Sequence, residues 1–281
     1  MLKTLLLLGV GNAALAVNKA AAGSYETVYG TTRQPEKCPY LLEQRITPIL
    51  CDAISPESLG KIREIATDSH VVASFPPDEV SDSLLSETVS MASKIVYISS
   101  TGVYGGISGI IDETSPVDSG NPATTARLRA EHTWQGRGAI VLRAPALYDT
   151  NYGLHKSLLD GKFRLPGDGT RYSSRIHLDD LATIVLKALL LAPCGSTYVV
   201  GDETPCPQIE VVQWLCDRLH LEPPPSIPIE QAHITQQGNR QINSRKVLSD
   251  LGISLRFPSY RDGFEQCIRE YDRAGEGAME A

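Results

Sequence analysis

Short apolar runs alternate with longer amphipathic stretches through the first half of the chain. The runs are rich in Leu, Val and Ile, which is typical of strands buried on both faces of a parallel sheet. Strands are predicted at residues 5–10, 26–30, 47–52, 70–75, 94–99 and 139–143, and helices at 13–22, 56–67, 83–93 and 123–135. This alternation favours a doubly wound α/β fold, with helices on both faces of a parallel sheet.

The pattern changes near residue 150, where elements become shorter and Pro and Gly more frequent. Residues 165–169 (LPGDG) predict a turn, and the three prolines at 223–225 predict a rigid linker. Helices are predicted at 178–191, 208–219, 244–251 and 260–272, with a strand at 197–200. We therefore expect residues 1–150 to form the core domain. Residues 151–281 should contribute to that core and also form a smaller C-terminal lobe.

Composition narrows the class of protein. A chain of 281 residues that is 42% hydrophobic can bury a sizeable core, and its net charge of -7 predicts no nucleic-acid partner. The start of the chain resembles a secretory signal, but the leucines at 5–8 lead directly into Gly9 and Gly11, which favours a buried strand and no membrane partner. Six cysteines scattered singly predict reduced thiols in a cytoplasmic protein and no metal site.

A glycine-rich turn follows the first predicted strand. Residues 9–14 read GVGNAA, which fits the pattern GxGxxA between a strand and a helix. Gly9 would permit a tight turn, Gly11 would let a pyrophosphate approach the backbone, and Ala14 would allow the helix to pack closely on the strand. Asn12 would begin the helix whose N-terminus faces the phosphates. The alternative is an ordinary tight turn, but the position favours dinucleotide binding.

The end of the second strand indicates which dinucleotide binds. Residues 31–33 read Thr-Thr-Arg, with no carboxylate to bind the 2′-hydroxyl of NAD. The guanidinium of Arg33 and the hydroxyl of Thr32 suit a 2′-phosphate, so NADP(H) is favoured over NAD(H). Arg33 as a solvated surface residue is the alternative. Ser74 and Pro76, after the fourth strand, either line the nicotinamide half of the site or simply end the strand.

Three segments carry a more specific pattern. They read YISSTGVYG at 97–105, RAPALY at 143–148 and SRIHLDDLA at 174–182. These segments resemble the extended short-chain dehydrogenase/reductases, whose sugar-nucleotide epimerases and dehydratases carry SS-x-x-VYG. The resemblance includes Asp112, Glu113 and Pro116 and continues weakly at 240–243 and 251–252, so it extends over nearly the whole chain. It implies a Rossmann fold in which residues 1–150 bind the dinucleotide and a C-terminal lobe binds substrate.

The catalytic motif of that family is incomplete here. Ser100 occupies the serine position, but Ala123 and Arg127 stand where the family has the Tyr and Lys of YxxxK. Alanine cannot exchange a proton, and arginine is too basic to titrate near neutral pH. The pattern is similar to the atypical, YeeZ-like group. Arg127 would bind ribose or pyrophosphate, or else be a surface charge.

Three functions remain open at this stage. The first is an NADP-dependent oxidoreductase or epimerase-like enzyme acting on a small carbonyl or sugar-nucleotide-type substrate. In that enzyme Ser100 or Thr101 would be the hydrogen-bond partner and Tyr104 a proton donor, although Tyr104 as a packed aromatic is the alternative. The second is a non-catalytic redox-sensing protein that binds NADP(H). The third is a scaffold without cofactor.

Substrate contacts are expected after Arg143 and in the C-terminal lobe. The candidates are Tyr148, Asn151, Tyr152, His155, Arg171 and Arg175, with Tyr148 and Arg175 foremost. His177, Asp179 and Asp180 cluster, but the resemblance implies a structural role in which Asp180 ties the lobe to the core. The oligomeric state stays open; by resemblance, the helices at 83–93 and 123–135 are the candidate interface of a homodimer.

Overall fold

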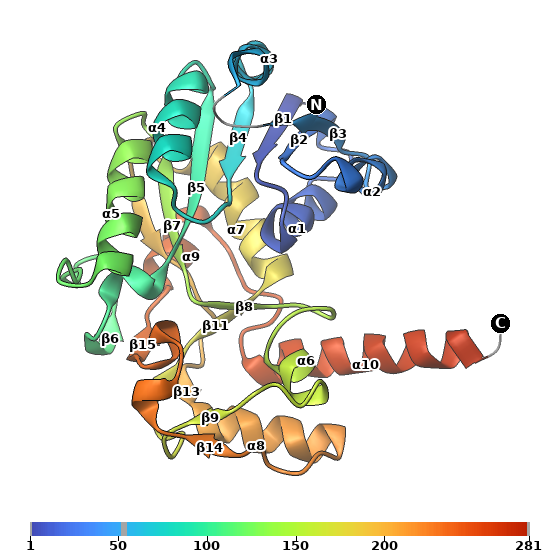
Figure 1. Cartoon of the computed structure of the whole chain (residues 1–281), viewed down its shortest axis with the longest axis vertical. Coiled ribbons are helices and arrows are strands. Elements are labelled where there is room, and N and C mark those ends of the chain that lie inside the picture. The colour runs from blue at the N-terminus through green and yellow to red at the C-terminus, as the bar shows by residue number, and fades with distance from the viewer. Residues whose placement is uncertain (1, 52–54, 280–281) are drawn as a thin grey trace.

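The computed structural model describes residues 2–51 and 55–279; Asp52, the last residue of the predicted third strand, lies outside them. Its centre is a parallel sheet in the spatial order β12-β7-β5-β4-β1-β2-β3 (Figure 1). The strands are β1 (Leu2–Leu8), β2 (Tyr25–Thr32), β3 (Thr47–Leu50), β4 (His70–Ala73), β5 (Lys94–Ser100), β7 (Ile140–Ala144) and β12 (Thr197–Val199). The predicted Rossmann-type α/β fold is confirmed. Strand order reverses between β1 and β4, so ligands are expected beyond the carboxyl ends of these two strands.

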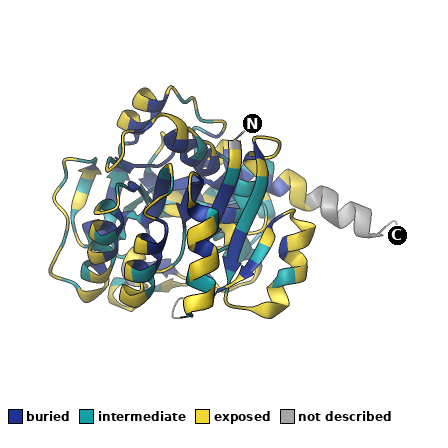
Figure 2. Ribbon diagram, turned by 90° about the horizontal axis from the view of Figure 1, so that it is seen from above, coloured by how far each residue is buried: buried dark blue, intermediate teal, exposed yellow. Residues whose placement is uncertain are grey.

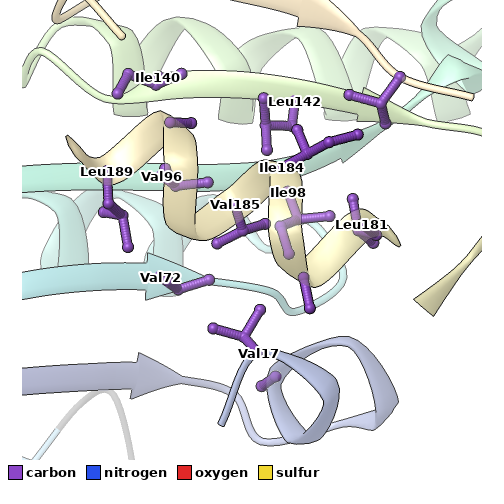
Figure 3. Close-up of a cluster of buried hydrophobic side chains, with 14 of the residues drawn as sticks. Val17, Val72, Val96, Ile98, Ile140, Leu142, Leu181, Ile184, Val185 and Leu189 are labelled. Carbon is purple, nitrogen blue, oxygen red and sulfur yellow. The ribbon is translucent and has the colours of Figure 1, made fainter. Parts of the chain in front are cut away.

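Helices cover both faces of this sheet. One face carries α1 (Asn12–Ala20), α2 (Cys38–Glu43), α7 (Leu178–Leu191) and α9 (Arg245–Leu251). The other carries α3 (Pro56–Ala66), α4 (Glu79–Thr88) and α5 (Pro122–Gln135). In Figure 3, apolar side chains of α1 and α7 meet those of β4, β5 and β7. Figure 2 shows the result, with buried strands between helices whose outer faces are exposed.

The leucines of β1 explain this double coverage. Leu5 and Leu7 pack into the cluster that contains α1 and α7, whereas Leu6 and Leu8 pack into the cluster on the α3–α5 face. All four are fully buried. Successive side chains of a strand point to opposite faces, so an uninterrupted apolar run is what a central parallel strand requires.

The remaining elements form a smaller, less regular lobe at the carboxyl edge of the sheet (Figure 1). Four strand pairs build it: β6 (Ser108–Ile111) with β15 (Asn239–Ile242), β8 (Ala146–Tyr148) with β11 (Arg175–His177), β9 (Leu165–Pro166) with β14 (Ser226–Ile227), and β10 (Tyr172–Ser173) with β13 (Cys206–Pro207). Its helices are α6 (Leu154–Leu159), α8 (Gln208–Leu219) and α10 (Tyr260–Met279). Short 3-10 turns lie at Pro35–Lys37, Thr101–Tyr104, Ile229–Gln231 and Ile234–Gln236.

Asp180 joins the two parts of the molecule. It lies in the first turn of α7, and its two carboxylate oxygens accept hydrogen bonds from the backbone N–H groups of Arg256 (2.8 Å) and Phe257 (2.9 Å). These residues immediately precede α10. Asp180 therefore ties the lobe to the core, as the resemblance implied.

Several predicted boundaries shift. The helix predicted at 83–93 instead begins at Glu79, because the Asp78 carboxylate accepts a hydrogen bond from Ser81 N–H (2.8 Å) and so caps the first turn. The lobe strands, several only two residues long, escaped prediction together with α2 and α6. Among the described residues, no helix is long and apolar enough to cross a membrane, and no His, Cys, Asp and Glu group is placed to hold a metal.

Candidate active site

The turn after β1 is held between two neighbouring strands. Gly9 has φ +80°, and a Cβ there would come within 2.9 Å of the Cβ of Phe75. Its N–H donates to Thr31 Oγ1 (2.8 Å), and its carbonyl accepts from Ser74 Oγ (2.9 Å). The partly buried Ser74 thus fixes the turn itself, and Pro76 lies exposed just beyond it. Glycine is needed at position 9 because another residue would be both strained and crowded.

The next residues leave an anion-binding surface open. Gly11 is the N-cap of α1 without a side-chain cap, and a Cβ placed on it would meet no atom within 4 Å. Asn12 is exposed, the first turn of α1 carries no acidic residue, and Ala14 is fully buried against the sheet. Backbone N–H groups at a helix N-terminus carry partial positive charge, so these residues fit the pyrophosphate of a dinucleotide.

The residues predicted to choose between NADP and NAD lie at the end of β2. Thr31 is buried beneath the turn, whereas the Thr32 hydroxyl accepts from Gln34 N–H (3.1 Å) in a local turn. Arg33 is exposed, and within the described part of the chain no carboxylate lies within ion-pair distance of it. Its charge is therefore available to an anionic ligand.

Ser100 ends β5 at the same edge of the sheet. Its Oγ accepts a hydrogen bond from Gly102 N–H (3.0 Å), which leaves the hydroxyl hydrogen free to be donated. Both Ser100 and the buried Thr101 line a cavity of about 690 Å³ that extends into the lobe. The predicted hydrogen-bond partners of a substrate are thus in contact with that cavity.

The structure corrects the prediction that Tyr104 donates a proton. Tyr104 is fully buried and does not line the cavity. Its hydroxyl donates to the carbonyl of Asp112 (3.1 Å) and accepts from Arg143 (3.0 Å), so both of its hydrogen-bonding functions are occupied. Burial also raises the pKa of this phenol. Tyr104 is a packed aromatic residue that links β7 to the loop after β5.

Arg143 belongs to a buried ionic network. Its guanidinium binds both carboxylate oxygens of Glu131, with the shortest distance 2.7 Å, and Ser99 Oγ donates to the same carboxylate (2.6 Å). Glu131 is 1% exposed. The network connects α5 to β5 and β7, so every charge in it has a partner and its role is structural.

Helix α5 carries the two residues that replace the YxxxK pair. Ala123 is exposed at its start, and Arg127 is partly exposed one turn later. Arg127 has no hydrogen bond or ion pair within the described residues. Its positive charge acts to lower the pKa of Asp82 and Tyr97, which lie between α4, α5 and β5. Burial raises the pKa of both of those residues. Neither Ala123 nor Arg127 lines the cavity.

Basic side chains dominate the charged lining of the cavity. Five basic residues and one acidic residue line it: Lys156, Lys162, Arg171, Arg175, Arg240 and Asp160. Lys162 pairs with Asp160 (2.8 Å). The cavity therefore has a net positive lining, which favours an anionic ligand.

Within the described part of the chain, the three arginines that line the cavity donate side-chain hydrogen bonds only to uncharged groups. Arg171 donates to the carbonyl of Gln237 (2.7 Å), and Arg175 donates to Ser173 Oγ (2.7 Å). Arg240 donates to the carbonyl of Gly105. Arg175 was predicted to contact substrate, but Arg240 was not. Arg240 lies in a segment with only weak similarity to the family, and the local sequence gives no signal that its side chain is buried.

Tyr148, the other foremost substrate candidate, is also corrected. It is 1% exposed and does not line the cavity, because its ring packs on Phe264 (4.2 Å between centroids) and His177 (5.2 Å) in the lobe core. His155 is likewise buried and does not line the cavity. Of the lesser candidates, Asn151 and Tyr152 do line it.

Comparison with known proteins supports the fold. No protein-family model matches the sequence. A 3-diazoavenalumate denitrifying reductase from a Streptomyces species is 27% identical over 177 residues, which is 55% of this chain and 58% of that protein. The chain therefore matches little more than half the length of this curated relative.

Solved structures match nearly the whole chain. A conserved protein of unknown function from Silicibacter pomeroyi has a TM-score of 0.80 at 23% identity, covering 95% of this chain and 98% of that one. A putative NAD-dependent epimerase/dehydratase from Methylobacillus flagellatus has 0.76 at 20%, covering 97% and 100%. A dTDP-glucose 4,6-dehydratase from Bacillus anthracis, in complex with NAD, has 0.79 at 17%, covering 98% of each chain. These likenesses establish the architecture.

Proposed function

We propose that this chain is an atypical short-chain dehydrogenase/reductase, an NADP(H)-dependent oxidoreductase or epimerase-like enzyme. Its substrate would be a small carbonyl or sugar-nucleotide-type compound. The observation that carries the proposal is that an open phosphate-binding turn at Gly9 and Gly11 shares one edge of the sheet with a cavity lined by Ser100. This edge is where open α/β folds bind ligands. The structural neighbour that holds NAD supports a nicotinamide dinucleotide here.

NADP(H) is the cofactor we favour. Arg33 is the only charged residue of the segment 31–33, and it has no carboxylate partner among the described residues. A guanidinium binds a phosphate through charge-assisted hydrogen bonds. NAD(H) is the alternative, because the structural neighbours crystallised with a dinucleotide hold NAD.

The proposed chemistry uses Ser100 without a tyrosine beside it. The bound nicotinamide would supply or accept a hydride. Ser100 would donate its free hydroxyl hydrogen to the substrate oxygen, while Thr101 would shape the wall next to it. A single donor aimed at developing negative charge is a substantial catalytic contribution.

The absence of a general acid favours a second, non-catalytic function. Ala123 cannot exchange a proton, and the hydroxyl of Tyr104 is already bound on both sides. A chain that kept the phosphate turn and lost its general acid could report the redox state of NADP(H) to a partner without turnover. We keep this non-catalytic protein as the alternative.

Turnover separates the two functions. Purified protein with NADPH would be exposed to a panel of carbonyl, enoyl and sugar-nucleotide compounds, and absorbance at the nicotinamide band followed. The enzyme proposal predicts loss of NADPH with at least one class, and Ser100→Ala slowing it by about a hundredfold. Ser83→Ala, on the exposed side of α4, is the control and should match the wild type. Tight NADPH binding without consumption would favour the sensor.

A further inference from the structure

Arg240 is a buried cation that has no counter-ion among the residues the structure describes. The residue is 8% exposed, and within the described chain no carboxylate lies within ion-pair distance of its guanidinium. Its one side-chain hydrogen bond goes to the carbonyl of Gly105. Burial lowers its pKa, and no opposite charge offsets that effect. An unpaired buried charge is costly, so its retention calls for a partner that binds from outside.

The guanidinium is connected to Ser100 through one short turn. Ser100 Oγ accepts from Gly102 N–H (3.0 Å), the Gly102 carbonyl accepts from Gly105 N–H (3.1 Å), and the Gly105 carbonyl accepts from Arg240. Ser100, Gly102 and Arg240 all line the cavity. The free donor of Ser100 and the unpaired charge of Arg240 therefore belong to one wall.

The dinucleotide phosphates are not the partner that Arg240 lacks. Strand β15, which carries Arg240, pairs with β6 in the lobe, whereas the phosphate turn lies at the start of α1. Figure 1 shows β6 and β15 below α5 and well separated from α1. The ligand that meets Arg240 must enter the cavity itself.

We propose that Arg240 binds an anionic oxygen of the substrate in the wall of the cavity that also contains Ser100. The assignment of that oxygen to a substrate rests on the proposed function. Two sources share this chemistry: a carboxylate or phosphate that the substrate carries, or the oxygen that becomes negative as a hydride adds to its carbonyl carbon. In the second case the C=O π-bond breaks as the carbon is reduced and NADPH is oxidised. The resulting alkoxide then takes a proton from water in the open cavity and releases hydroxide.

Gly238 offers a way to move the charge without removing it. A Cβ at this position would collide with the Arg240 guanidinium, which is the far end of a flexible side chain. Gly238→Ala should therefore displace the guanidinium and leave the net charge unchanged. Arg240→Met removes the charge, and Arg240→Lys keeps it without the planar pair of donors.

Calorimetric titration of the protein with inorganic phosphate tests the site. Arg240→Met is expected to weaken phosphate binding by about tenfold or more, the loss expected for a charged hydrogen-bond partner. Gly238→Ala and Arg240→Lys should fall between that variant and the wild type. The matched control is Arg164→Met, an exposed arginine that also donates to backbone carbonyls but does not line the cavity. It should bind phosphate as the wild type does.

Two results would overturn the proposal. One is phosphate binding by Arg240→Met at wild-type strength; the other is its loss in Arg171→Met but not in Arg240→Met. NADPH titration of the same variants keeps the two ideas apart, because Arg240→Met should leave NADPH affinity unchanged. Failure of the wild type to bind NADPH refutes the proposed function alone. For a substrate found in the screen, a raised KM in Arg240→Met indicates a resident anion, and a lowered kcat indicates the developing oxyanion.

Discussion

The core and the lobe treat buried charge in opposite ways. In the core, Arg143 and Glu131 bind each other at 2.7 Å, and Ser99 and Tyr104 satisfy their remaining groups. In the lobe, the buried side chain of Arg240 bonds only to a carbonyl among the described residues, and the Oδ2 atom of the buried Asp202 has no hydrogen-bond partner among them. A charge that the protein pairs for itself holds the fold together. A charge left unpaired beside a cavity is available for a ligand.

The largest expected effect comes from breaking the paired network. Glu131→Ala leaves the Arg143 charge uncompensated, so we expect the free energy of unfolding to fall by about 3–5 kcal/mol. Urea denaturation followed by circular dichroism measures it. Glu265→Ala removes the partner of Arg218 in a more exposed pair and should cost about 1 kcal/mol or less. Equal losses in the two variants would contradict the structural role of the core network.

The buried carboxyl of Asp202 should make stability depend on pH. Burial raises its pKa to about 7, so the folded state keeps a proton that the unfolded chain, with the ordinary lower pKa, releases. This contribution is fully present below about pH 4 and is lost as the pH rises through 7, with a slope of at most about 1.4 kcal/mol per pH unit.

Asp202→Asn isolates that contribution. The difference in free energy of unfolding between wild type and variant, measured by urea titration at several pH values, should shift against the wild type as the pH rises from 4 to 7. Asp168→Asn is the control, because that carboxyl is solvent-exposed in a turn. A difference between the wild type and Asp202→Asn that stays constant over this range would contradict the assigned pKa.

Two glycines of the phosphate turn should respond differently to the same change. Gly9→Ala places a side chain at positive φ against Phe75, so it should lower the free energy of unfolding by about 1–3 kcal/mol. Gly11→Ala projects into open space at an ordinary φ of -114° and should change stability by less than about 0.5 kcal/mol. Its effect should instead be a loss of dinucleotide affinity. Thermal unfolding and NADPH titration together distinguish a structural glycine from a ligand-facing one.

The stability effect expected at Arg240 is small. Replacing an unpaired buried cation by an apolar side chain of similar length removes a desolvated charge and one hydrogen bond, so Arg240→Met should change the free energy of unfolding by about 1 kcal/mol or less. A fall of several kcal/mol in the free energy of unfolding, measured by urea denaturation, would show that Arg240 stabilises the fold rather than binding a ligand.

The sequence predicted the long helices better than the short strands of the lobe, for a physical reason. The predicted bounds of α7 and α8 match the structure, because long amphipathic helices carry a strong periodic signal. The pair β6–β15 joins residues 108–111 to 239–242, and no local sequence pattern predicts a contact between segments so far apart in the chain. Short strands of the lobe form only because distant segments meet.

The site shows the same division. The roles of Gly9 and Ala14 follow from a motif whose spacing encodes the turn, and the structure places them as that motif requires. Tyr104 was a misleading candidate because a tyrosine in the sequence does not show whether its hydroxyl is free. Here the hydroxyl is hydrogen-bonded to the Asp112 carbonyl and to Arg143. Arg240 was missed because its side chain is held by the carbonyl of Gly105, a residue distant in the sequence that only tertiary structure brings to it.

Dinucleotide binding is the property on which both proposed functions depend, and calorimetric titration with NADPH and NADH tests it most directly. We expect NADPH to bind more tightly than NADH, Arg33→Ala to weaken only NADPH, by about tenfold or more, and Gly11→Asp to abolish both. Arg63→Ala, an exposed arginine on α3, is the control and should leave both affinities unchanged. Failure of the wild type to bind either dinucleotide would contradict both the enzyme and the sensor.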